Sequence, residues 1–140
     1  MHVKRDILAN SSRYFKTMMG SRWTESKGDI IVLEDDTMRS MEIWLRYHHC
    51  TLDAISLDDI SVADIWHVIL ASDQYQFDRD ELQEWFIRWF RNATAGGIHC
   101  DRLANKLMLP CYAFDYAKGF QVRTRSLAYE ERGHIMEVNP

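Results

Sequence analysis

The first part of the chain has apolar residues at spacings of three and four, which is the pattern of one face of an α-helix. In Asp6 to Met19 this pattern continues on both sides of a polar interruption, Asn10-Ser11-Ser12. We therefore expect two short helices that are joined by a tight turn. Gly20-Ser21 ends this unit.

A different pattern follows, and it predicts a short strand. Asp29 to Leu33 is mostly β-branched, which is typical of a buried strand. A single strand leaves its backbone polar groups unpaired, so it needs neighbours in a sheet. We expect residues 1–4 and 51–55 to supply these neighbours.

Three helices are predicted in the middle of the chain. The first begins after a cap at Asp36 or Thr37 and ends near residues 48–50. The second begins at Ser61 to Asp64, which resembles a capping box. The third follows Asp78 to Glu81, and its apolar residues have the spacing of a buried helix face. These residues are Leu82, Trp85, Phe86, Trp89 and Phe90.

The last part of the chain is predicted to be a helical appendage behind a hinge. Residues 92–100 form the hinge because Gly96-Gly97 holds a helix poorly. The apolar spacing after it predicts one short helix, and Pro110 is suitably placed for the first turn of another. We expect a domain over residues 1–91, the hinge, and a helical extension with a tail over residues 101–140.

Composition and charge narrow the class of protein. Of 140 residues, 46% are apolar and 12% are aromatic, which is typical of a folded domain and not of a disordered chain. The net charge of −4 argues against binding of nucleic acid through a basic surface. No apolar run has the ~20 residues that cross a bilayer. Three cysteines, an odd number, fit a reducing compartment. We expect a soluble intracellular protein of the cytoplasm or nucleus that binds neither nucleic acid nor membranes.

No set of residues in the sequence is typical of catalysis or of metal binding. Adjacent His48 and His49 would point about 100° apart on a helix, and no second Cys or His cluster completes a metal site with them. The chain has no GxSxG, P-loop or GxGxxG motif. We therefore expect no enzymatic activity, no cofactor and no metal.

Trp23 and Glu25 are the candidate partner-binding residues. They lie in a polar loop, Trp23-Thr24-Glu25, outside any periodic apolar face. A large aromatic side chain beside a carboxylate suits a binding hot spot. The alternative is that Trp23 folds back and covers the helix pair.

The segments described above, in this order, resemble the BTB/POZ domain, in particular that of fungal proteins. The resemblance covers residues 3 to about 91 and rests on an ordered set of short fragments. These are Val3 to Leu8, Ser12 to Phe15, Trp23 to Ser26, Ile30 to Asp36, Leu45 to Tyr47, Ala71 to Phe77 and Leu82. Residues 109–135 are similar to the helical extension that follows the domain in fungal members.

The resemblance implies an α+β fold that is mostly helical: a helical cluster against a small three-stranded sheet, followed by a C-terminal helical extension. The chain departs from the family pattern at three points. Lys4 replaces a histidine, His48 to Thr51 replace a Tyr-Thr-Gly, and the first strand is missing. We therefore expect an incomplete sheet and weakened dimerisation, because an unpaired strand edge favours association or misfolding. A longer reading frame upstream of Met1 is expected to encode the missing strand.

The resemblance implies protein binding without catalysis. Many family members dimerise, many join substrates to the cullin scaffold of RING ubiquitin ligases, and others assemble transcriptional repressors. In the adaptors a hydrophobic-x-Glu motif contacts the cullin, and Trp23-Thr24-Glu25 has this pattern. We expect a ligase adaptor that binds a cullin through Trp23 and Glu25. The alternative is a self-associating scaffold or transcriptional co-regulator without a ligase role.

Overall fold

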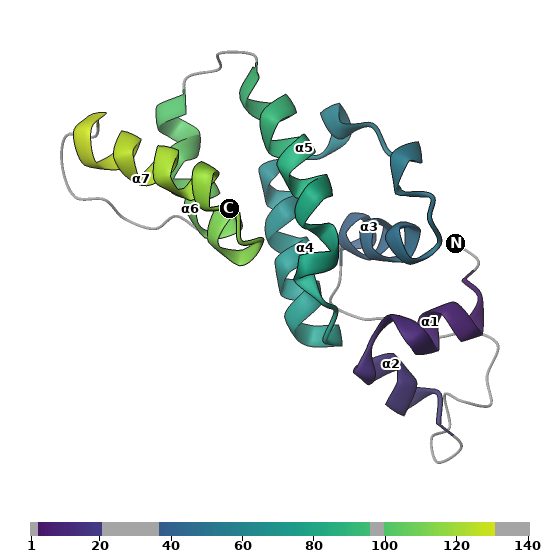
Figure 1. The fold of residues 1–140 in the computed structure, drawn as a ribbon. Coiled ribbons are helices and arrows are strands. Elements are labelled where there is room, and N and C mark those ends of the chain that lie inside the picture. The colour runs from purple at the N-terminus through teal and green to yellow at the C-terminus, as the bar shows by residue number, and fades with distance from the viewer. Residues whose placement is uncertain (1–2, 21–36, 96–99, 131–140) are drawn as a thin grey trace. The chain divides into compact units, whose positions relative to one another are not determined.

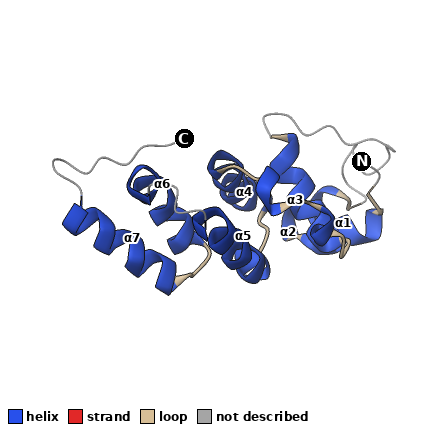
Figure 2. Cartoon of the chain, turned by 90° about the horizontal axis from the view of Figure 1, so that it is seen from above, coloured by secondary structure: helices blue, strands red, loops and turns tan. Residues whose placement is uncertain are grey.

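The computed structural model describes residues 3–20, 37–95 and 100–130, and all regular elements in these ranges are helical (Figures 1 and 2). The α-helices are α1 (Arg5–Ser11), α2 (Arg13–Met18), α3 (Met38–His48), α4 (Val62–Tyr75), α5 (Gln83–Ala95), α6 (Cys100–Ala113) and α7 (Ala117–Glu130). The short 3-10 turns are η2 (Leu52–Ala54), η3 (Leu57–Asp59) and η4 (Arg79–Leu82). The predicted mostly helical class is therefore confirmed.

The small sheet that we expected has no strand among the residues that the structure describes. The prediction of a strand at 51–55 is wrong, because Leu52–Ala54 form a 3-10 turn. A 3-10 turn places residues three apart on one side, and Leu52 and Ile55 are accordingly both buried. Residues 3 and 4 are not a strand either, and Lys4 precedes α1 as its N-cap. The strand predicted at 29–33 lies outside the described residues, and those that are described do not by themselves form a BTB/POZ-like fold.

The chain divides into two compact units. The first contains residues 1–55 and 67–78, and the second contains residues 56–66 and 79–140. The division falls within α4, whose first turn belongs to the second unit and whose remainder belongs to the first.

The first unit is built on an aromatic core that packs against the α1–α2 helix pair. The polar interruption ends α1 as predicted, and Ser12 caps α2 by accepting a hydrogen bond from the Phe15 N–H at 3.2 Å. Phe15 and Trp44 are fully buried, and Tyr75 and Phe77 are nearly so. Phe15 stacks on Tyr75 with ring centroids 5.2 Å apart, and Trp44 stacks on Phe77 at 4.7 Å. Stacked rings of this kind fix α2 and α3 against the end of α4.

Side-chain caps begin the helices where the sequence predicts them. Thr37 caps α3 by accepting a hydrogen bond from the Ser40 N–H at 3.3 Å. The capping box at the start of α4 is also confirmed. The Asp64 N–H donates to Ser61 Oγ at 3.1 Å, and the Ser61 N–H donates to Asp64 Oδ2 at 2.8 Å.

The second unit packs α5 against the antiparallel pair α6–α7. The predicted apolar face of α5 is confirmed, because Trp85, Phe86, Trp89 and Phe90 are all buried. Phe86 stacks on Phe114 at 4.5 Å. The α6 and α7 helices lie side by side in both views (Figures 1 and 2).

Pro110 lies inside α6 and does not begin a new helix, which corrects the sequence prediction. Proline lacks an N–H, so within a helix it leaves the carbonyl four residues earlier without its usual donor. That carbonyl belongs to Lys106, and it accepts a hydrogen bond from Trp66 Nε1 at 2.9 Å. The helix therefore continues through the proline because an indole from α4 replaces the missing backbone donor.

Three described helices end on a non-glycine residue in the left-handed conformation. The residues are Cys50, Gln76 and Asp115, with φ of 54°, 56° and 48°. The backbone N–H of the next residue donates a hydrogen bond to the carbonyl five residues before it. These bonds join Thr51 to Arg46, Phe77 to Ser72, and Tyr116 to Cys111. The pattern is that of the Schellman motif, in which glycine is the usual residue because it has no Cβ.

Candidate functional site

The candidate partner-binding residues Trp23 and Glu25 lie outside the described residues. The hydrophobic-x-Glu motif therefore stays a prediction, as does the alternative in which Trp23 covers the helix pair. The described part of the chain nevertheless contains a pocket on the helix that immediately precedes this segment.

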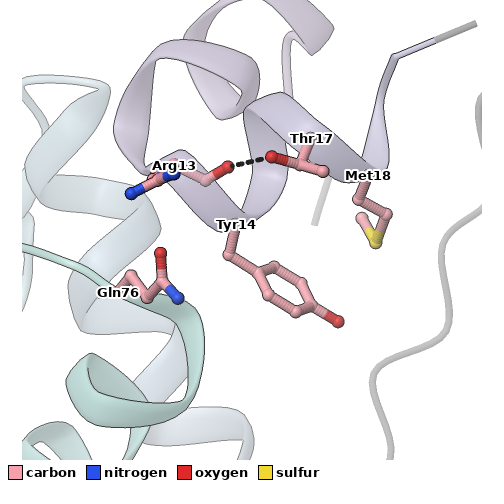
Figure 3. Close-up of a pocket in the computed structure, with 5 residues that line it drawn as sticks. All are labelled: Arg13, Tyr14, Thr17, Met18 and Gln76. Atoms are coloured by element: carbon pink, nitrogen blue, oxygen red, sulfur yellow. Dashed lines mark hydrogen bonds between the residues drawn. The ribbon is translucent and has the colours of Figure 1, made fainter.

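The pocket lies in the first unit and has a volume of about 340 Å³. It is lined by α2 and by the residue that follows α4 (Figure 3). The lining residues are Arg13, Tyr14, Thr17, Met18 and Gln76. Those on α2 form two pairs at i and i+4, which is the spacing of side chains that neighbour each other on a helix surface.

The apolar wall of the pocket is rigid because the aromatic core supports it. Tyr14 is 39% exposed, and its ring meets Phe15 and Tyr75 edge to face, with centroids 5.3 and 5.1 Å apart. Figure 3 shows the Tyr14 ring and the Met18 side chain on the same side of α2. A fixed ring beside a flexible thioether offers a surface that adapts to an apolar side chain of a partner.

The polar side chains of the pocket are Arg13, Thr17 and Gln76. The Thr17 hydroxyl donates to the Arg13 carbonyl at 2.9 Å, so its oxygen remains available as an acceptor. Gln76 adopts positive φ, and Figure 3 shows its amide on the side that faces α2. The Arg13 side chain is exposed, and α2 carries the additional cation Lys16 but no acidic residue. The pocket therefore combines an apolar wall with a positive charge.

This combination suits the binding of a side chain from a partner. The described lining residues supply an aromatic ring, a thioether, a guanidinium, a hydroxyl and an amide. An apolar side chain with a neighbouring carboxylate matches the pocket, because a guanidinium pairs with a carboxylate through two parallel hydrogen bonds.

The two adjacent histidines occupy structural positions at the end of α3. His48 is half-buried, with its ring centroid 6.2 Å from that of Trp44 and 5.5 Å from that of Phe77. Burial lowers the pKa of His48, and the neighbouring His49 lowers it further. The ring of His49 approaches the Leu45 carbonyl, with 2.6 Å between Nδ1 and the oxygen. Within the described residues no group of three or more metal-ligating side chains occurs.

The described cysteines differ in environment. Cys50 is exposed, and Cys111 is buried in α6. Burial raises the pKa of Cys111 to about 12, against the opposing effect of the Arg123 guanidinium. Cys111 is thus a packing residue, because the thiolate is the reactive form of cysteine and is suppressed there.

None of the five pocket residues was among the predicted binding residues. The i, i+4 pairs on α2 follow from the sequence once the two short helices are predicted. The position of Gln76 in the pocket could not be predicted from the sequence. It depends on a left-handed backbone conformation, which is uncommon for a residue other than glycine or asparagine.

Comparison of the chain with protein-family models, with curated proteins and with solved structures gave no match. Among the described residues, no helix has both the length and the apolar character needed to cross a membrane.

Proposed function

We propose that the chain is a non-catalytic protein-interaction module, and specifically an adaptor that joins a substrate to the cullin of a RING ubiquitin ligase. The observation that carries the interaction role is the pocket on α2, with its rigid Tyr14 ring, its Met18 thioether and its Arg13 charge. Tyrosine, arginine and methionine are enriched at the centres of protein interfaces.

The adaptor role rests on the BTB/POZ resemblance and on the position of the hydrophobic-x-Glu motif in the chain. Trp23 follows Met18 by 23 − 18 = 5 residues. Five residues span at most about 18 Å, so one partner helix is long enough to contact both the motif and the pocket. The finer fold proposed with this role is a BTB/POZ-like domain with a C-terminal helical extension.

Binding of an isolated cullin N-terminal domain to the full chain tests the adaptor role. We expect the Trp23→Ala, Glu25→Ala double variant to lose binding and Tyr14→Ala to weaken it by about tenfold, which is 1.4 kcal/mol. Tyr112→Ala is the matched control, because Tyr112 is a tyrosine that is 72% exposed and lies in the second unit. Equal binding by the wild type and all variants would remove both the motif and the pocket from the proposal.

The alternative function is a self-associating scaffold or transcriptional co-regulator without a ligase role. It is supported by the apolar wall of the pocket, formed by Tyr14 and Met18, which a second copy of the chain would cover. Light scattering distinguishes the two functions: a dimer that does not bind the cullin domain supports the scaffold, and a monomer that binds it supports the adaptor.

A further inference from the structure

The exposed side of α7 carries a row of alternating cationic and apolar side chains. The row consists of Lys118, Val122, Arg125 and Tyr129, and we call it the α7 stripe. All four residues are exposed, with Val122 at 47% and Tyr129 at 83%. Their spacings of four, three and four place them on one helix face and match the seam of a coiled coil.

The α7 stripe is not used in the packing of its own helix pair. α7 packs through a different face, which contains Gly119, Arg123, Ser126 and Leu127. At Gly119 the backbone comes so close to α6 that an added Cβ would lie 2.8 Å from Cys111 Sγ. The α6–α7 pair is therefore complete without the stripe.

The charges of the stripe have no described counter-charge. Neither the Lys118 nor the Arg125 side chain forms a hydrogen bond or ion pair with any other residue that the structure describes. Both cations occupy the same heptad position because they are seven residues apart, and the same holds for Val122 and Tyr129. The stripe thus offers one cationic and one apolar position per heptad.

The alternation of cationic and apolar side chains indicates what kind of partner the stripe would bind. A helix that presents leucine at one facing position and glutamate at the other would cover the apolar side chains and neutralise both cations. A second copy of α7 would instead bring four cations into one seam without an acid, which is repulsive. Two cations on a chain of net charge −4 are also too few for a nucleic-acid surface. We propose that the α7 stripe is the docking site of an acidic amphipathic helix of a partner protein.

Binding of two designed peptides to the full chain tests this site. Each peptide has about three heptads and leucine at one facing position, and the other facing position is glutamate in the first peptide and lysine in the second. We expect the glutamate peptide to bind and the lysine peptide not to bind. Raising the salt concentration should weaken the binding, because the exposed charges are then screened.

The variants distinguish an effect of the stripe on binding from an effect of the net charge of the chain. Lys118→Gln with Arg125→Gln lowers the net charge by two. Ala54→Glu with Gln74→Glu lowers it by the same amount at exposed positions of the first unit, which does not contain α7. The first pair should weaken binding at least about tenfold, and the control pair should leave it nearly unchanged. Tyr129→Ala should weaken binding without any change in net charge.

Three results would overturn the proposal. They are equal binding of the two peptides, equal loss of binding in the two double variants, and a dimer of the free chain that Tyr129→Ala dissociates. The last result would assign the stripe to a second copy of the chain.

Discussion

Replacing Trp66 with phenylalanine removes the indole N–H that donates to the Lys106 carbonyl at 2.9 Å. Trp66 is only 7% exposed, so water cannot readily take the place of the lost donor. A buried carbonyl without a partner costs about 1–3 kcal/mol. Loss of part of the ring adds a packing cost of about 1 kcal/mol. We therefore expect Trp66→Phe to lower the free energy of unfolding by about 2–4 kcal/mol.

A second substitution separates the hydrogen bond from the packing. Pro110→Ala restores a backbone N–H at position 110, and this N–H donates to the Lys106 carbonyl in a regular helix. In the Pro110→Ala background the carbonyl keeps a donor when Trp66 is replaced. The cost of Trp66→Phe should then fall by about 1–3 kcal/mol, while its packing part of about 1 kcal/mol remains.

The assay is urea unfolding of the four proteins of this double-mutant cycle, followed by far-UV circular dichroism. Tryptophan fluorescence is unsuitable here because two of the four proteins lack one of the five tryptophans. A single transition at all probe wavelengths is required before free energies are compared, because the chain has two compact units.

A matched control uses a second buried indole. Trp89 Nε1 donates to the Ile60 carbonyl at 3.0 Å, and Pro110 takes no part in that bond. Trp89→Phe should therefore cost the same free energy with and without Pro110→Ala. If the cost of Trp66→Phe is likewise the same in both backgrounds, within about 0.5 kcal/mol, the indole is not the substitute donor for the helix, and our explanation of the proline is refuted.

Further predictions concern a glycine, a helix end and a histidine. Gly119→Ala should destabilise the chain by about 1–3 kcal/mol, since the new Cβ meets the Tyr116 ring and Cys111 Sγ; an unchanged thermal midpoint would contradict this. Gln76→Gly should raise the free energy of urea unfolding by about 0.5–1 kcal/mol, because glycine adopts the observed φ of 56° without steric cost; a loss of stability would show that the side chain holds the turn. The pKa of His48 is lowered in the folded chain, so below about pH 6.5 the unfolded chain binds a proton that the folded chain does not. Stability should therefore fall as the pH drops through this value, and His48→Phe should reduce the difference between urea midpoints measured at neutral and mildly acidic pH. An equal difference in the wild type and the variant would assign the acid sensitivity to other groups.

Local patterns predicted most of the described helices. The polar interruption at residues 10–12, the Thr37 cap and the capping box at residues 61–64 act on neighbours within four residues. Their effect is therefore contained in short stretches of sequence. The apolar face of α5 was likewise predictable, because burial follows directly from the helical period.

The errors arose where a distant residue changes the outcome. The sequence predicts Pro110 as a helix start, because the missing N–H of proline is harmless there. Inside α6 the indole of Trp66, which is 110 − 66 = 44 residues earlier, donates to the Lys106 carbonyl in its place. The prediction of a strand at 51–55 rests on the strand predicted at 29–33, which would need a neighbour. The spacing of Leu52 and Ile55 fits the observed 3-10 turn equally well.

The candidate site was less predictable than the fold. Its apolar wall requires Tyr14 to rest on Tyr75, which is 61 residues later, and its rim requires the left-handed backbone of Gln76. Neither the contact of Tyr14 with Tyr75 nor the backbone conformation of Gln76 can be recognised from neighbouring residues in the sequence. The sequence therefore predicts Trp23 and Glu25 as binding residues and does not indicate the pocket on α2.

The buried indoles also bear on how the chain folds. The N–H groups of Trp44, Trp66 and Trp89 each donate to a backbone carbonyl, at sequence separations of 24, 40 and 29 residues. Helices form in about a microsecond, whereas contacts between distant segments must first close a long loop. Each of these three bonds therefore forms only when the chain has closed a loop of 24 to 40 residues. Because they involve the natural fluorophores, the emission of the unmodified chain reports when its distant segments meet.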